Sequence, residues 1–260
     1  RSNCVTGVQT CALPIFRSII RFYEMADEVW IPQAAVEETL REYGYKGKVE
    51  VVDNGSDFAG NIPVEQLRRS ARDKLRLPSD EFMFLFVGQH IWEKNLEFLL
   101  EALAEIRTLP FRMYFIGSGY AASELRRKTE DLYLTDKVIF MGSITERERL
   151  KLYYAAADLF LFPSLYDNAP LVVREAAALH TPSLLIKGST SAEVIHDSVN
   201  GFLSDNSVTA YASRISQLLE TPQLIAEAGE AASHSIARSW EDVAEEVYDR
   251  YVNLIHRSGN

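Results

Sequence analysis

The stretch FPSLYDNAPLVVREAAALHTP, residues 162–182, carries the most information about this chain. It starts in an apolar segment, passes through a polar loop and enters an alanine-rich helical pattern. Asp167 falls in the loop, and Glu175 falls eight positions later in the expected helix. Pro170 suits the first helical turn, because its missing N–H would have no intrahelical acceptor there. The stretch therefore predicts two carboxylates at the junction of a buried strand and a helix.

The start of this helix also offers backbone donors. The N–H groups of Leu171 and Val172 would be free to meet an anion, since a first helical turn lacks intrahelical acceptors and carries the positive end of the helix dipole. Asp167 and Glu175 could accept hydrogen bonds from hydroxyl groups on either side. This arrangement suits a ligand that combines phosphate with sugar hydroxyls. The alternative is that Asp167 caps the helix and Glu175 is a solvated surface residue.

Strand-like and helical patterns alternate from about residue 26 onward, with short loops marked by glycine. We expect strands at 26–32, 48–57, 81–88, 111–119, 136–142, 158–164 and 181–188. We expect helices at 34–44, 64–77, 95–109, 123–134, 146–157, 169–180 and 190–197, then a turn at 200–202 and further helices ending with 239–255. The apolar run EFMFLFVG at 81–88 is typical of a parallel strand buried on both faces. The alternation predicts an α/β fold with a doubly wound parallel sheet.

Ligands of such a sheet bind beyond the carboxyl ends of its strands. Four expected loops at that edge carry glycine or polar residues: Gly88–Asn95, Gly117–Gly119, Met141–Thr145 and Pro163–Pro170. Gly88 ends one strand and Lys94 precedes the next helix, where a cation and free N–H groups attract phosphate. Gly117 and Gly119 follow the next strand. The alternatives are a solvated loop charge for Lys94 and an ordinary tight turn for the two glycines.

Composition excludes several classes of protein. The formal net charge of -10 argues against a nucleic-acid partner. No apolar run reaches the roughly 18 residues of a membrane-spanning helix. Cys4 and Cys11 have no zinc or redox spacing, and no carboxylate cluster of the magnesium type is evident, so we expect no metal. The remaining sequence has no cysteine, which favours a reducing, cytoplasmic compartment.

The N-terminal residues 1–16 look non-native. RSNCVTGVQTCALPIF is similar to a translated sequencing adapter, and the alternative of a signal peptide lacks a clear apolar region and cleavage site. The chain has no initiating Met, and we expect it to be the C-terminal part of a longer protein. A cluster of Gly, Asp, Asn and Pro at Gly55–Pro63 predicts a domain boundary. The segment before it holds about one βαβ unit, which is too little to bury a core alone.

The motifs together resemble the donor-binding half of the family 4 retaining glycosyltransferases. The resemblance covers roughly residues 26–256 and is carried by Gly88 with Glu93-Lys94, Gly117-Ser118-Gly119, the VIFMG strand, and Asp167-x7-Glu175 followed by AAALHTP. It implies the GT-B fold, in which two Rossmann-like domains face each other across a nucleotide sugar. Residues 59–238 would form the complete C-terminal donor domain and 17–58 a remnant of the mostly missing N-terminal acceptor domain. Residues 239–260 would hold the C-terminal crossover helix.

The resemblance also implies roles for matched residues. Lys94 would contact the donor diphosphate, Asp167 the hydroxyls of the donor sugar, and Glu175 the ribose hydroxyls, which makes these three the candidate catalytic residues. The full set of candidate donor contacts is Gly88, Gln89, Lys94, Gly117, Gly119, Met141, Ala169, Pro170, Leu171 and Glu175.

The sequence departs from the family pattern in three places. Gln89 stands where the family has arginine, so a charge that would neutralise diphosphate is missing, and Arg174 is a conceivable substitute. Asp167 stands where glutamate is usual. Asn168-Ala169-Pro170 replaces a Gly-Phe-Gly sequence, and its proline removes an N–H donor.

The resemblance implies transfer of a hexose, with retained anomeric configuration, from a UDP- or GDP-sugar to a lipid or saccharide acceptor, without a metal. Positive charge and helix N–H groups would stabilise the leaving diphosphate. One alternative is a nucleotide-sugar-binding fragment without turnover, and another is a UDP-sugar epimerase of the same fold. A phosphorylase would need a pyridoxal-phosphate lysine site, which is not evident. The basic run RRSARDKLR at 68–76 could touch the inner face of a membrane, or be a solvated helix face.

Overall fold

The structure is a computed structural model that describes residues 6–60, 63–78 and 81–258. The chain divides into two compact units, one of Gly55–Asp242 and one of Arg1–Asn54 with Val243–Asn260.

The larger unit contains a six-stranded sheet in which all neighbouring strands are parallel. Its strands are β3 (Phe82–Val87), β4 (Phe111–Ile116), β5 (Val138–Gly142), β6 (Leu159–Phe162), β7 (Ser183–Ile186) and β8 (Phe202–Ser204). They lie in the order β5-β4-β3-β6-β7-β8, so the direction of winding reverses between β3 and β6. The expected doubly wound parallel sheet is confirmed.

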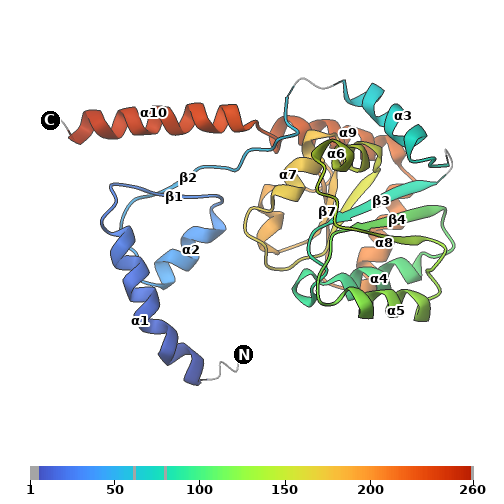
Figure 1. Cartoon of the computed structure of the whole chain (residues 1–260), viewed down its shortest axis with the longest axis horizontal. Helices are drawn as coiled ribbons and strands as arrows, with labels where there is room; N and C mark the ends of the chain where they lie inside the picture. Colours follow the sequence, from blue (N-terminus) through green and yellow to red (C-terminus); the bar gives the residue numbers. More distant parts are fainter. Residues whose placement is uncertain (1–5, 61–62, 79–80, 259–260) are drawn as a thin grey trace. The chain divides into compact units, whose positions relative to one another are not determined.

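Helices cover both faces of this sheet (Figure 1). One face carries α4 (Leu96–Glu105), α5 (Ala122–Asp131) and α8 (Val208–Leu219), and the other carries α3 (Val64–Lys74), α6 (Arg147–Ala156), α7 (Leu171–Ala178) and α9 (Pro222–Ser235). Two short 3₁₀ helices are η1 (Trp92–Lys94) and η2 (Thr190–Val194). The central strands are buried on both faces, and Phe84, Phe86 and Phe160 are fully inaccessible. This double burial explains why β3 is a continuous apolar run rather than an alternating one.

One prediction for this sheet is wrong in part. Residues 200–202 were expected to form a turn, but Phe202 begins the edge strand β8, which pairs with β7. The Asn200-Gly201 pair directly before the strand indicates a turn, and Asn200 does lie in one.

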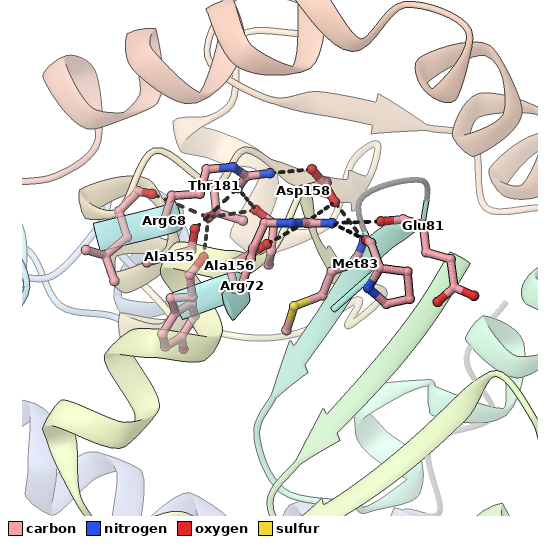
Figure 2. Close-up of polar contacts among 12 residues, drawn as sticks. Arg68, Arg72, Glu81, Met83, Ala155, Ala156, Asp158 and Thr181 are labelled. Carbon is pink, nitrogen blue, oxygen red and sulfur yellow. Dashed lines mark hydrogen bonds and ion pairs between the residues drawn. The ribbon is translucent and has the colours of Figure 1, made fainter. Parts of the chain in front are cut away.

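The basic run at 68–76 is partly structural, which corrects the expectation of a lipid-facing or solvated surface. Arg68 and Arg72 of α3 both pair with Asp158, which precedes β6 (Figure 2). Arg68 donates to the carbonyl of Ala157 at 2.6 Å and Arg72 to that of Ala156 at 3.1 Å. These carbonyls lie at the C-terminal end of α6, where a helix favours positive charge. The two arginines therefore fasten α3 to the sheet layer.

The smaller unit contains α1 (Thr6–Tyr23), β1 (Val29–Ile31), α2 (Ala35–Glu42), β2 (Val49–Val51) and most of α10 (Trp240–Ser258). Strands β1 and β2 are parallel. The Trp30 and Tyr251 rings meet edge to face at 5.1 Å, and Arg250 lies 3.5 Å from Glu50. Helix α1 begins inside the segment that looks non-native from sequence, and Cys4 lies outside the described residues.

Candidate functional site

Glycines bring two loops into contact at the carboxyl ends of β3 and β4. Gly117 has a φ of 139°, and a Cβ built there would lie 1.8 Å from the carbonyl oxygen of Gly88. A Cβ on Gly119 would lie 2.3 Å from the carbonyl oxygen of His90. The His90 N–H donates to the carbonyl of Ser118 at 2.9 Å. Gly117 and Gly119 therefore do more than form a tight turn, because they allow the β3 loop to pack directly on the β4 loop.

Lys94 and Asp167 meet at the point where the strand order reverses. Lys94 ends η1 in the loop after β3, and Asp167 lies in the loop after the neighbouring strand β6. Their side chains form an ion pair and are 19% and 20% exposed. Asn95, at a left-handed φ of 58°, donates from its side chain to the carbonyl of Pro163 at 3.2 Å and ties the same two loops together. Lys94 is therefore not a solvated loop charge.

The loop that carries Asp167 is fixed by hydrogen bonds and a strained residue. The Asp167 N–H donates to the Thr190 hydroxyl at 2.8 Å, and this hydroxyl donates to the Asp167 carbonyl at 3.1 Å. Ala169 has a φ of 44°, a conformation that residues other than glycine rarely adopt. Pro170 is the N-cap residue and α7 begins at Leu171, one position later than a proline in the first turn would give. The N–H of Leu171 has no intrahelical acceptor at this position.

Glu175 lies one turn into α7 and is buried. The Tyr154 hydroxyl donates to its Oε2 at 2.8 Å, and the Arg147 guanidinium donates to its Oε1 at 2.7 Å. Burial and the nearby carboxylate charge raise the pKa of Tyr154 well above its usual value, so the hydroxyl stays protonated and donates. The alternative interpretation, a capping Asp167 and a solvated Glu175, is wrong, since Pro170 holds the N-cap position and Glu175 is buried.

Arg147 was not predicted from sequence as a site residue. It is the first residue of α6 and follows the expected β5 loop. Besides Glu175, it contacts Asp57 at 3.1 Å, and its guanidinium lies 4.3 Å from the Phe58 ring centroid. Burial lowers the pKa of Arg147, but the hydrogen bond and charge of Glu175 outweigh it, so the pKa is raised overall. The sequence did offer one indication of this role. Arg147 comes two positions after the expected loop Met141–Thr145, which lies at the ligand-binding edge of the sheet.

Gln89, Met141 and Arg174 differ in their exposure and contacts. Gln89 is exposed beyond the end of β3. Met141 lies within β5, and its sulfur accepts a weak hydrogen bond from the Tyr153 hydroxyl at 3.9 Å. Arg174 is buried and donates to the carbonyl of Ile236 at 2.9 Å. Arg174 thus lies among core residues, so the idea that it replaces the missing arginine beside Gln89 is wrong.

Two features of the described residues concern metal binding and membranes. Across 6–60, 63–78 and 81–258, no group of three or more His, Cys, Asp or Glu side chains is arranged to hold a metal ion. Within that same part of the chain, every helix is too short or too polar to cross a membrane.

A doubly wound parallel sheet with polar residues gathered at its switch point defines a Rossmann-like ligand-binding domain. Residues 68–235 match the family model described as "Glycosyl transferases group 1". The chain belongs to this glycosyltransferase family.

The chain is similar to curated relatives over much of its length. It is 32% identical over 232 residues to D-inositol 3-phosphate glycosyltransferase 2 of Catenulispora acidiphila, covering 84% of this chain and 54% of the relative. It is 27% identical over 209 residues to alpha-monoglucosyldiacylglycerol synthase of Streptococcus pneumoniae, covering 78% of this chain and 47% of the relative. The chain thus spans about half the length of these relatives.

Solved structures share the fold. Sucrose-phosphate synthase from Thermosynechococcus elongatus superposes with a TM-score of 0.80 at 26% identity, covering 93% of this chain and 62% of that one. Anabaena HepE, solved in complex with UDP and glucose, superposes with a TM-score of 0.79 at 20% identity, covering 93% and 67%. These structures are GT-B glycosyltransferases, in agreement with the fold class expected from sequence.

Proposed function

We propose that the whole protein transfers a hexose from a UDP- or GDP-sugar to a lipid or saccharide acceptor with retention of configuration. The observation that carries this proposal is the Lys94–Asp167 pair across the switch point of the sheet. A cation beside a carboxylate at this point offers one group for diphosphate and one for sugar hydroxyls. Family membership and the Anabaena HepE complex with UDP and glucose support a nucleotide-sugar donor.

Each side chain has a separate task in this proposal. Lys94 and the first N–H groups of α7 neutralise the charge that grows on the departing diphosphate, which lowers the barrier because these groups are already in place. Asp167 accepts hydrogen bonds from the donor sugar, and Glu175 accepts them from ribose. The chain's own cations and N–H groups would thus neutralise the diphosphate.

The Streptococcus pneumoniae relative is a glycolipid synthase by name. This similarity supports a lipid, rather than a saccharide, as the acceptor. Such an enzyme would work in the cytoplasm against the inner face of a membrane. Arg68 and Arg72 are held by Asp158, but Arg69, Lys74 and Arg76 are exposed on or just after α3. These three cations are the part of the basic run that an anionic lipid surface could attract.

A second candidate function is nucleotide-sugar binding without turnover. Exposed Gln89 and buried Arg174 favour it, because neither supplies the cation that the family pattern has beside the diphosphate. A hexosyl-transfer assay separates the two candidates, since binding without transfer supports the second. The family match gives no support to an epimerase.

The test is calorimetric titration of UDP and of GDP into the chain, with Glu175→Gln as the variant and the exposed Glu148→Gln of α6 as the matched control. We expect saturable binding of one nucleotide, weakened by Glu175→Gln and unchanged by Glu148→Gln. Folding of both variants is checked by thermal melting. A folded wild-type chain that binds neither nucleotide contradicts the proposal.

A further inference from the structure

Helix α6 holds the Glu175 carboxylate by both oxygens. Arg147 reaches Oε1 and Tyr154 reaches Oε2, and the two donors stand about two turns apart on the same helix. The Glu175 side chain is 9% exposed, whereas that of Arg147 is 42% exposed. A carboxylate has about four lone-pair sites, so each oxygen keeps room for one further donor. Glu175 is thus fixed in place yet still able to accept hydrogen bonds.

Arg147 is itself held in place by Asp57 and Phe58, which lie near the start of the larger unit. Its guanidinium lies on the Phe58 ring and contacts Asp57 at 3.1 Å. Phe58 is 2% exposed and meets the Tyr154 ring at 5.9 Å. The Phe58 N–H donates to the Ser56 hydroxyl at 3.1 Å, which stiffens this short segment. The guanidinium therefore has a stacking surface on one side and carboxylates at its edge.

We propose that Arg147 is a positioning residue that orients the Glu175 carboxylate toward the ribose hydroxyls of the donor, with Asp57 and Phe58 holding Arg147 in place. This inference rests on the proposed function. Arg147 acts through Glu175 and needs no contact with the ligand. A planar guanidinium suits the task because its several N–H groups hold a carboxylate in a defined plane, which a flexible ammonium does less well.

The burial of Glu175 argues that the pair is more than a structural tie. Burying a carboxylate is costly, and an apolar residue of similar size is often at least as stable as a buried ion pair. An ionised side chain at this place in α7 is therefore better explained by what its free lone pairs can bind. The same reasoning makes Tyr154 the second support of the carboxylate, since its hydroxyl is fully committed to Oε2.

The test compares two ligands that differ at the ribose. UDP and its 2′,3′-dideoxy analogue, or the guanosine pair if GDP binds better, are titrated into the wild-type chain, Arg147→Met and Arg147→Lys. The control is Arg149→Met, an exposed arginine two positions further along α6 that lies 3.8 Å from Glu146. In the wild type, loss of the hydroxyls should weaken binding roughly tenfold or more, as expected for hydrogen bonds to a charged group.

We expect this discrimination to fall to about two- or threefold in Arg147→Met, to be partly kept in Arg147→Lys, and to be unchanged in Arg149→Met. A general structural role would not change the ratio of the two affinities in a folded variant. Arg147→Met that discriminates as well as the wild type overturns the inference. If Arg147→Met weakens the binding of both ligands by the same factor, the inference is also overturned, because Arg147 would then contact the phosphates that both ligands share.

Asp57→Asn serves if Arg147→Met does not fold, because it keeps Arg147 and removes one of its anchors. A smaller but measurable drop in ribose discrimination supports the inference, and wild-type discrimination in this folded variant overturns it. A wild-type chain that binds the nucleotide but ignores the ribose hydroxyls overturns the role of Glu175 and this inference with it. A wild-type chain that binds neither nucleotide instead contradicts the proposed function itself.

Discussion

Lys94 and Asp167 pair with each other across the two loops that flank the reversal of strand order in the sheet. In the proposed function, Lys94 contacts the donor diphosphate and Asp167 contacts the hydroxyls of the donor sugar. Within this ion pair the charge of each side chain is balanced by the other. If the proposed function holds, a donor that binds here replaces this ion pair with its own phosphate and hydroxyl groups.

Lys94→Met should weaken binding of UDP by roughly tenfold or more, because a charge-assisted contact with diphosphate is lost. Binding of uridine, which has no phosphate, should change little. Calorimetry with both ligands measures this, and Lys128→Met is the matched control because Lys128 also pairs with carboxylates, those of Glu97 and Glu101 on α4. Equal losses for UDP and uridine would show that Lys94 does not contact the diphosphate.

Asp167→Asn should have opposite effects on two ligands. It releases Lys94 from a partly exposed ion pair worth on the order of 1 kcal/mol, so UDP should bind up to about fivefold more tightly. The extra affinity of a UDP-sugar over UDP should decrease, because an ionised acceptor for sugar hydroxyls is lost. Titration of UDP and UDP-glucose measures both effects. Weaker binding of UDP itself would mean that Asp167 supports the nucleotide site instead.

Gln89→Arg should restore the cation that the family pattern has after Gly88. Gln89 is exposed at the ligand-binding edge, so the added charge should strengthen UDP binding by about two- to fivefold at low salt, and less in high salt because of screening. Calorimetry at two salt concentrations measures the effect. Gln66→Arg on the exposed side of α3 is the control for added charge alone. An equal gain in both variants would point to a general electrostatic effect.

The sheet could be predicted from sequence because its buried strands are long apolar runs separated by helical patterns. Strand β8 could not, because the Asn200-Gly201 pair directly before it indicates a turn. Lys94, Asp167 and Glu175 could be named because loops after parallel strands meet at one edge. Arg147 could not, because its contact with Glu175 depends on how α6 and α7 are rotated about their axes. Arg174, the sequence neighbour of Glu175, illustrates the same limit, since it points to the carbonyl of Ile236 instead.

Arg72→Met should destabilise the larger unit by roughly 2–4 kcal/mol, because it leaves Asp158 and several carbonyls short of a donor. The Arg72 guanidinium donates to Asp158 and to the carbonyls of Ala156, Pro78 and Glu81 (Figure 2). Urea unfolding followed by circular dichroism measures the change.

Arg69→Met is the matched control for this variant, since Arg69 lies on the same helix with its side chain exposed. We expect it to change the free energy of unfolding by less than about 0.5 kcal/mol. Similar stabilities of the two variants would show that the Asp158 cluster adds little, as is common for surface ion pairs.

The burial of His90 predicts that the stability of the folded protein depends on pH. Its ring is buried beside Phe86, Phe115 and Phe140, with centroids 5.8–6.3 Å away, and its Nε2 has no hydrogen-bond partner among the described residues. Burial, and then the charge of Arg126, lower its pKa from the usual 6.5, so the folded protein holds it neutral. The unfolded chain takes up a proton as pH falls below 6.5 and the folded chain does not. The stability that neutral His90 gives the folded protein above pH 6.5 is therefore lost as the pH falls toward the lowered pKa of His90.

His90→Phe should remove this proton uptake and the unpartnered nitrogen together, because phenylalanine fits an aromatic environment. We expect a gain of about 1 kcal/mol in the free energy of unfolding at pH 7, and a larger gain at pH 5. Denaturation at several pH values between 5 and 7.5 measures both, with the exposed His196→Gln as control. Some slope should remain, since burial also lowers the pKa of His180. A slope identical to that of the wild type would mean that His90 is protonated equally in the folded and unfolded chains.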